Sequence, residues 1–189
     1  MSVELAAREQ SRARYPDEEG YVERDGVRVF YEVYGSGEPT VFLLPTWSMI
    51  HSRHWKMQVP YLARHCRVVT FDGRGNGRSD RPQGAEAYAI RAFAADALAV
   101  LDATATERAV LVGVSCATLW GVVLAAEHPE RVAGAAFIGP AVPLSPPLPE
   151  RTVYPFDERL DTDEGWAKYN IHHWQRDYRD FLEFFLAKC

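Results

Sequence analysis

Two hydrophobic patterns along the chain predict two kinds of β-strand. In the segment YVERDGVRVFYEVYG (21–35), hydrophobic residues of the second half alternate with mostly polar ones, as in a strand with one buried face. Asp25-Gly26 divides the segment, and this dipeptide favours a tight two-residue turn. The sequence therefore predicts a β-hairpin here.

Four later runs are apolar without alternation, which is typical of strands covered on both faces in a parallel sheet. They lie at residues 40–44, 67–71, 109–112 and 135–139. Helical periodicity of apolar positions marks residues 90–104, and residues 116–128 read as a helix that ends before Pro129. A weaker helical signal, interrupted by Pro60, covers residues 55–65.

Alternation of strands and helices predicts right-handed βαβ units and an α/β fold, with a mostly parallel twisted sheet and helices on both faces. The pattern changes after Gly139, where a proline-rich stretch cannot continue a regular element. An aromatic-rich helical pattern resumes at about residue 163. The aromatic side chains of this segment predict either a lid over a site or a small hydrophobic core.

Composition and charge narrow the classes of function. The net charge is −5, from 26 acidic and 21 basic residues, and no dense Lys/Arg block is present, which argues against nucleic acid as a partner. Cys66, Cys116 and Cys189 form no paired framework. No apolar run reaches the roughly 18 residues of a membrane span, and the N-terminus lacks a signal-peptide pattern. We therefore expect a cytoplasmic protein without a membrane-spanning segment.

The segment Gly113-Val114-Ser115-Cys116-Ala117 lies between a predicted strand and a predicted helix. This is the place in a fold where a nucleophile elbow lies, which is a sharp turn that carries a reactive residue between a strand and a helix. The strained backbone of such a turn requires small residues two positions before and after the nucleophile. Ser115 at the helix N-terminus would be a nucleophile, and the backbone N–H of Cys116 a natural oxyanion donor.

Two alternatives to this assignment of Ser115 stay open. The Cys116 thiol could be the nucleophile, although Val114 and Thr118 would then occupy the positions that need small residues. Ser115 could also simply cap the helix, because serine is a preferred N-cap residue.

Two further motifs support the nucleophile assignment. The first is FLLPTW, at the end of the first apolar run, and the second is VVTFDGRGNGRSDRP. The second contains the pattern D-x-R-G-x-G-x-S as Asp72, Arg74, Gly75, Gly77 and Ser79. With these motifs, residues 21–140 resemble the serine-nucleophile branch of the α/β-hydrolase superfamily.

The resemblance assigns residues one by one. It implies that Ser115 is the nucleophile and that the backbone N–H groups of Cys116 and Trp47 form the oxyanion hole. The chain departs from the family pattern at Pro45-Thr46, where His-Gly is usual, and at Ala117, where glycine is usual. Haloalkane dehalogenases and epoxide hydrolases are disfavoured, since those relatives carry Asp at the Ser115 position.

The general base and the acid have no recognisable place in the chain. The resemblance puts both near the C-terminus of the fold, and only 74 residues follow Ser115. His128 lies at the far end of the helix that Ser115 begins, roughly 18 Å away at ~1.5 Å per residue. The pairs His51/His54 and His172/His173 satisfy no spacing requirement, either as a base or as metal ligands.

The sequence thus predicts a truncated hydrolase in three parts. These are a charged extension (1–19), a partial α/β-hydrolase core (20–140) and a proline-rich linker with a partial helical cap (141–189). The expected activity is cofactor-free and metal-free hydrolysis of an ester, lactone or related small-molecule acyl substrate. The alternatives are a non-catalytic binding protein and a chain whose partner supplies the base and acid. Without the last strands, we expect homo-oligomers through an exposed sheet edge.

Overall fold

The computed structural model describes residues 12–47, 50–142 and 152–188. Most of the predicted extension, most of the proline-rich linker and Cys189 lie outside these described residues. The chain divides into two compact units, Met1–Val142 and Pro143–Cys189, which we call the sheet unit and the helical unit.

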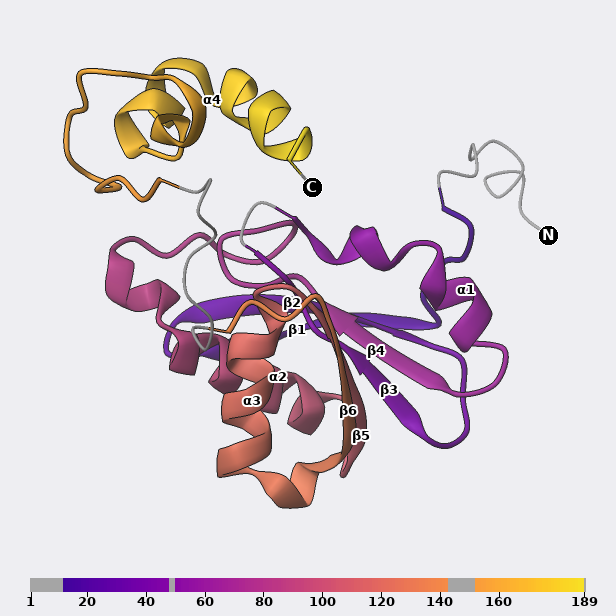
Figure 1. The fold of residues 1–189 in the computed structure, drawn as a ribbon. Coiled ribbons are helices and arrows are strands. Elements are labelled where there is room, and N and C mark those ends of the chain that lie inside the picture. The colour runs from indigo at the N-terminus through magenta and orange to yellow at the C-terminus, as the bar shows by residue number, and fades with distance from the viewer. Residues whose placement is uncertain (1–11, 48–49, 143–151, 189) are drawn as a thin grey trace, which may run out of the picture. The chain divides into compact units, whose positions relative to one another are not determined.

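A six-stranded mixed sheet forms the centre of the sheet unit (Figure 1). Its strands are β1 (Glu18–Arg24), β2 (Val27–Tyr34), β3 (Thr40–Leu43), β4 (Arg67–Phe71), β5 (Ala109–Val114) and β6 (Val132–Ile138). They lie in the order β1-β2-β4-β3-β5-β6. The pairs β4–β3, β3–β5 and β5–β6 are parallel, and β1–β2 and β2–β4 are antiparallel. The predicted mostly parallel sheet is confirmed.

The hairpin of β1 and β2 follows from its turn residues. Asp25 and Gly26 have φ values of 53° and 74°, so both central residues adopt the left-handed conformation that a two-residue hairpin turn requires. The predicted hairpin is confirmed. Strand β1 begins at Glu18, two residues before the predicted start of the core at residue 20, so the last residues of the predicted extension belong to the sheet.

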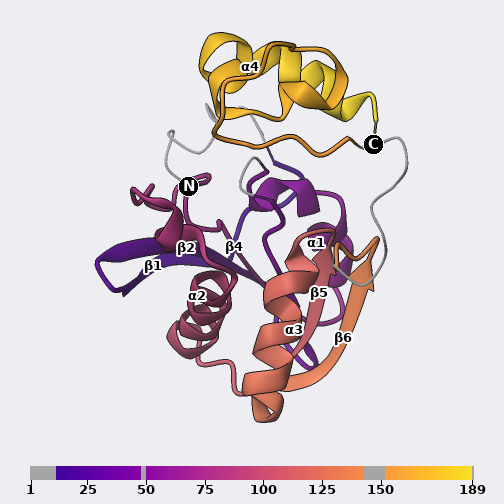
Figure 2. The same ribbon diagram turned by 60° about the vertical axis from the view of Figure 1, so that its left-hand side comes forward.

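Helices cover the two faces of this sheet unequally. They are α1 (Gln58–Leu62), α2 (Ile90–Ala103) and α3 (Ala117–Glu127). Helices α2 and α3 lie side by side on one face (Figure 2), where the Phe93 and Trp120 rings stack at a centroid distance of 4.7 Å. Helix α1 packs on the opposite face, and it is shorter than the predicted helix at 55–65. A 3₁₀ turn, η2 (Ser52–Trp55), precedes it.

The helical unit has a small aromatic core of its own. It consists of the 3₁₀ turn η5 (Gly165–Lys168) and helix α4 (Ile171–Leu186). The predicted helical pattern corresponds to these elements, and Asp177, at φ −150° and ψ 79°, kinks α4. The rings of Trp174 and Phe181 lie 4.8 Å apart within a larger aromatic cluster, and Phe181 is fully buried. Packing within the unit thus accounts for these rings as core residues.

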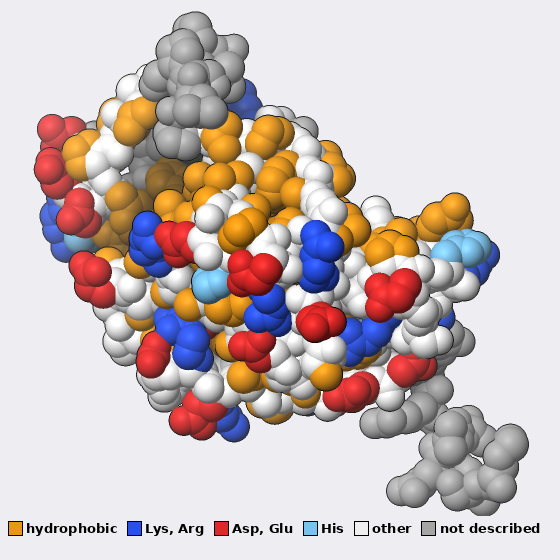
Figure 3. All heavy atoms as spheres, turned by 90° about the horizontal axis from the view of Figure 1, so that it is seen from below, with side chains coloured by type: hydrophobic (Ala, Val, Ile, Leu, Met, Phe, Trp, Pro, Cys, Tyr) orange, Lys and Arg blue, Asp and Glu red, His pale blue; other side chains and the backbone are white. Residues whose placement is uncertain are grey.

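Strand β6 forms one edge of the sheet among the described residues. Its sequence, VAGAAFI, contains no charged residue and no proline, the features that commonly protect an edge strand. Ala136 is exposed and Ile138 is 56% exposed. Seen from below, hydrophobic side chains gather on the side of the sheet unit where α3 and β6 lie, whereas charged side chains cover much of the remaining surface (Figure 3).

No helix within the described residues combines the length and the apolar character needed to cross a bilayer.

We propose that β6 mediates self-association. The chain at tens of micromolar should sediment as a dimer or larger species, because an unprotected apolar edge favours pairing with another strand. The variant Ala136→Lys places a charge on the edge and should shift the population toward monomer. Ala85→Lys, at another exposed alanine, is the matched control and should leave the distribution unchanged. A monodisperse monomer for the unmodified chain in light scattering would refute this proposal.

Candidate active site

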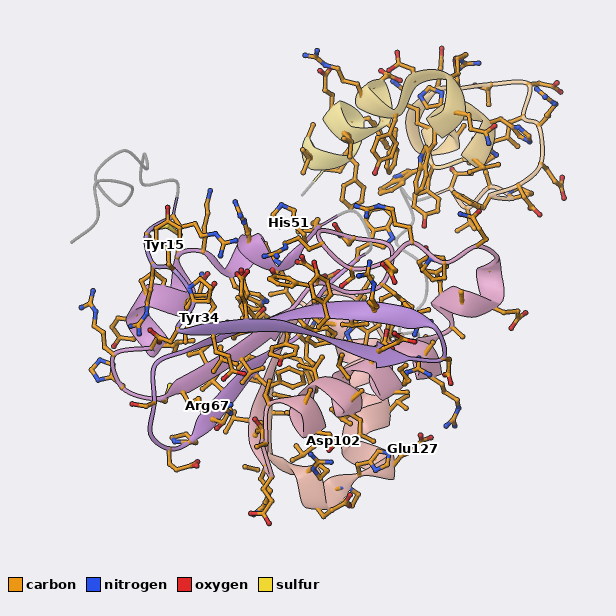
Figure 4. The ribbon with its side chains drawn as sticks, turned by 180° about the vertical axis from the view of Figure 1, so that it is seen from behind. Tyr15, Tyr34, His51, Arg67, Asp102 and Glu127 are labelled. Carbon is orange, nitrogen blue, oxygen red and sulfur yellow. The ribbon has the colours of Figure 1, made fainter. Side chains whose placement is uncertain are left out.

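The carboxyl ends of three neighbouring parallel strands bring the predicted motifs to one edge of the sheet. Strand β3 leads into Pro45-Thr46-Trp47, β4 into the loop that begins at Asp72, and β5 into Ser115. In Figure 4, His51, which follows the β3 loop, and Asp102, near the C-terminus of α2, lie at opposite ends of the sheet unit. The edge formed by the carboxyl ends of the strands is where ligands bind in open α/β sheets.

Ser115 occupies a strained turn between β5 and α3. Its φ is 54°, and the next residue, Cys116, returns to helical geometry at φ −59° and ψ −22°. A left-handed conformation costs roughly 1–2 kcal/mol for a residue with a Cβ atom, so surrounding contacts must maintain it. The Ser115 N–H donates to the Ile138 carbonyl (3.0 Å), and the Ala141 N–H donates to the Ser115 carbonyl (3.2 Å).

The small residues on either side of Ser115 are in close contact. A Cβ atom built on Gly113 would lie 2.8 Å from the Ala117 Cβ, closer than real Cβ atoms approach. The turn therefore tolerates the methyl group of Ala117 only because Gly113 has no side chain. This contact explains how the chain accommodates an alanine where the family usually has glycine.

The loop after β3 is fixed to the elbow by polar contacts. The Leu44 N–H donates to the Val112 carbonyl (2.9 Å), which extends the β3–β5 ladder. The Thr46 hydroxyl donates to the Val114 carbonyl (2.8 Å), and the Trp120 indole N–H donates to the Pro45 carbonyl (3.0 Å). Thr46 is also buried. The loop with Pro45-Thr46 in place of the usual His-Gly is therefore held by hydrogen bonds to β5 and α3.

The two predicted oxyanion donors lie next to these contacts, because Trp47 follows Thr46 and Cys116 follows Ser115. Trp47 is half-buried, and Cys116 is the N-cap residue of α3 and also half-buried. Among the described residues, no hydrogen bond is recorded from the Cys116 backbone N–H. The oxyanion roles of Trp47 and Cys116 stay predictions. The Cys116 sulfur lies 3.9 Å from the Ser115 hydroxyl oxygen.

The D-x-R-G-x-G-x-S motif supports the loops around the site. The buried Asp72 carboxylate accepts hydrogen bonds from the N–H groups of Ser52 (2.9 Å) and Arg78 (2.8 Å). A Cβ atom on Gly77 would lie 2.0 Å from that carboxylate, which explains the glycine. The Ser79 hydroxyl donates to the Asp72 carbonyl (2.6 Å). These contacts join the β4 loop to η2, next to the β3 loop.

A buried ion pair anchors the same motif to α2. The Arg74 guanidinium forms two bonds to the fully buried Asp96 carboxylate, at 2.6 and 2.7 Å, and Arg24 adds a third at 2.9 Å. Sequence reasoning did not identify Asp96. The apolar face predicted for this helix does not include residue 96, so the hydrophobic pattern does not predict that this carboxylate is buried.

The histidines of the helical unit form contacts within that unit. His173 is buried, with one ring nitrogen 2.9 Å from an Asp180 carboxylate oxygen and the other 3.0 Å from the Arg176 guanidinium. The His172 ring lies 3.0 Å from the Asp157 carbonyl. Both imidazoles thus have polar partners in their own unit.

The histidines after the β3 loop have a different environment. The His51 ring accepts from the Arg53 N–H (3.2 Å), and one ring nitrogen of His54 lies 3.0 Å from the His51 carbonyl. The other nitrogen of His54, Nε2, is buried without a partner among the described residues, and burial lowers the pKa of this imidazole. Within the described residues, the Ser115 hydroxyl contacts the Cys116 sulfur and forms no hydrogen bond with a histidine.

A cavity of about 520 Å³ lies beneath η2 and α1 in the sheet unit. Glu32, Tyr34 and Thr70 contribute to its lining from the sheet, and Ser115 is not among the lining residues. The Glu32 carboxylate already accepts from Arg12 (2.5 Å) and from the Tyr34 hydroxyl (2.7 Å). The described residues contain no group of three or more metal-ligating side chains.

Comparison with known proteins identifies the family. A model of the α/β hydrolase fold matches residues 39–184. The chain therefore belongs to the α/β-hydrolase family, as the three motifs predict.

Relatives within this family have different named activities. A protein of Variovorax paradoxus named as a carbamate hydrolase, RutD, is 40% identical over 57% of this chain and 41% of its own length. Epoxide hydrolase A of Mycobacterium tuberculosis is 36% identical over 66% and 39%. The structure of Est816, an N-acyl homoserine lactone degrading enzyme, aligns with a TM-score of 0.59 at 37% identity, over 64% of this chain and 45% of Est816. The chain spans less than half the length of these proteins.

The Gly113–Ala117 contact predicts a compensating pair of substitutions. Gly113→Ala should destabilise the protein by about 1–3 kcal/mol, because the added methyl group overpacks against Ala117. The double variant Gly113→Ala/Ala117→Gly should recover part of that loss. Urea unfolding of the four proteins in this cycle measures the coupling. Additive effects of the two substitutions would contradict the proposed contact.

Proposed function

We propose that this chain carries the nucleophilic half of a serine hydrolase, which acts through Ser115 on an ester, lactone or related acyl substrate. One observation carries the proposal, namely the left-handed conformation of Ser115 between a parallel strand and a helix. An ordinary N-cap serine has extended geometry and needs no strained turn. Strain at a residue with a reactive side chain is typical of functional sites.

In the proposed reaction, the Ser115 hydroxyl oxygen attacks the acyl carbon and its proton passes to a base. The carbonyl oxygen becomes an oxyanion, stabilised by the N–H groups of Cys116 and Trp47. When this intermediate collapses, the bond from the acyl carbon to the leaving oxygen breaks and the base gives its proton to that oxygen, which leaves as the alcohol. Water, losing a proton to the base, then attacks the acyl carbon, and the acid leaves as the base returns the proton to the Ser115 oxygen. Each donor of this kind contributes about 10²–10³-fold to the rate.

The named activities of the relatives bear on the substrate class. Est816 degrades a lactone, and RutD is named for carbamate hydrolysis, so two similar proteins are named for acyl-type bonds. Epoxide hydrolase A opens a different electrophile. Because the family resemblance implies Asp at the nucleophile position of epoxide hydrolases, the serine in this chain favours the acyl substrates.

A second candidate function is non-catalytic binding of a ligand or partner. It is favoured by the absence of a hydrogen bond between Ser115 and any histidine in the described residues. In a third arrangement, a partner chain supplies the base and the acid.

A fluorophosphonate probe tests the proposed nucleophile directly. The Ser115 oxygen should displace fluoride from phosphorus, so the unmodified chain should gain the mass of the probe less hydrogen fluoride, and Ser115→Ala should gain none. Cys116→Ala is the matched control for the neighbouring thiol and should still react.

The outcomes separate the candidates. Labelling that persists in Ser115→Ala and disappears in Cys116→Ala would assign the nucleophile to the thiol. A folded chain that never reacts, and does not hydrolyse acyl esters of several chain lengths, would favour the non-catalytic function. Turnover that appears only with a second polypeptide would indicate the partner arrangement.

A further inference from the structure

Thr46 replaces a backbone hydrogen bond of the sheet with a side-chain hydrogen bond. In the parallel ladder between β3 and β5, the Leu44 N–H donates to the Val112 carbonyl at 2.9 Å. The same register would pair residue 46 with the carbonyl of residue 114 at the next rung. There the hydroxyl of Thr46 takes the place of a backbone donor, at 2.8 Å from the Val114 oxygen.

This exchange allows the backbone to leave the sheet while the chain stays attached. Pro45 has no N–H to offer to a ladder, and its carbonyl is held by the Trp120 indole at 3.0 Å. The following residue, Thr46, is 5% exposed, so its hydroxyl has little access to water as an alternative partner. A glycine at this position could turn the backbone but could not supply the bond.

The acceptor of this bond is the residue before Ser115. Val114 is the last residue of β5, and its carbonyl belongs to the peptide group that leads into the strained turn. Trp47 follows Thr46 on the donor side, and Cys116 follows Ser115 on the acceptor side. One hydroxyl group therefore connects the two segments that carry the proposed oxyanion donors.

We propose that Thr46 is a positioning residue, whose hydroxyl bond to the Val114 carbonyl sets the position of the Trp47 backbone relative to the Ser115 turn. This inference rests on the proposed function of Ser115. A displacement of about 1 Å in a catalytic group can lower the reaction rate by about 10²-fold. Loss of the one hydrogen bond that anchors this loop should therefore lower the rate strongly.

Thr46→Val tests the inference, because valine keeps the branched shape and removes the hydroxyl. Its rate of fluorophosphonate labelling, or its kcat for an acyl ester, should fall about 10–100-fold, with KM changed less than twofold. Thr46→Ser restores the hydroxyl and should recover most of the rate. Exchange of the backbone amides of residues 44, 46 and 47 should become faster in Thr46→Val and not in Thr46→Ser.

Thr118→Val provides the matched control. The Thr118 hydroxyl is buried in the first turn of α3 and has no hydrogen-bond partner among the described residues. The same loss of a hydroxyl there should leave the labelling rate and the amide exchange of residues 44, 46 and 47 unchanged. If Thr46→Val fails to fold by circular dichroism, the smaller Thr46→Ala carries the same comparison with Thr46→Ser.

The results distinguish the two proposals. Equal labelling rates for the unmodified chain and Thr46→Val would overturn the role of Thr46 and leave Ser115 as the nucleophile. An equal rate loss in Thr46→Ser and Thr46→Val would also overturn it, because the hydroxyl would then not be the cause. An unmodified chain that never reacts would overturn the proposed function, and the inference about Thr46 with it.

Discussion

The strained backbone at Ser115 is the constraint on which the rest of the site depends. A φ of 54° is unfavourable for serine, and it persists because the peptide groups around it are held by other parts of the sheet. Strand β6 and the segment after it bind the Ser115 N–H and carbonyl, and the β3 loop binds the Val114 carbonyl. The turn is thus fixed from both neighbouring strands.

The surrounding core keeps these strands in place. The Trp120 ring stacks on Phe93 of α2 while its indole N–H holds the Pro45 carbonyl, so one side chain links the helical layer to the β3 loop. The buried pair of Arg74 and Asp96 similarly ties the β4 loop to α2. The β3 and β4 loops thus each have a buried anchor, so the rigid scaffold fixes the position of both loops.

Much of this arrangement could be predicted from the sequence because it depends on local rules. Asp25-Gly26 specifies the hairpin, continuous apolar runs specify the parallel strands, and Gly113 with Ser115 specifies the elbow. Contacts between distant residues could not be predicted in the same way. The hydrogen bond from Thr46 to Val114 joins residues that are 68 positions apart in the sequence. The ion pair between Asp96 and Arg74 forms only when α2 packs on the sheet. The kink of α4 at Asp177, by contrast, has a local cause, because the Asp177 side chain accepts a hydrogen bond from the Asp180 N–H (3.0 Å) and so caps the second part of the helix.

The strain at residue 115 can be measured by comparing Ser115→Gly with Ser115→Ala in urea unfolding. Glycine adopts a positive φ without steric cost, so Ser115→Gly should be more stable than Ser115→Ala by about 1 kcal/mol. At an ordinary negative φ, glycine is instead less stable than alanine by roughly 0.5–1 kcal/mol, through the greater entropy of the unfolded chain. A lower stability of Ser115→Gly would contradict the strained turn and the account built on it.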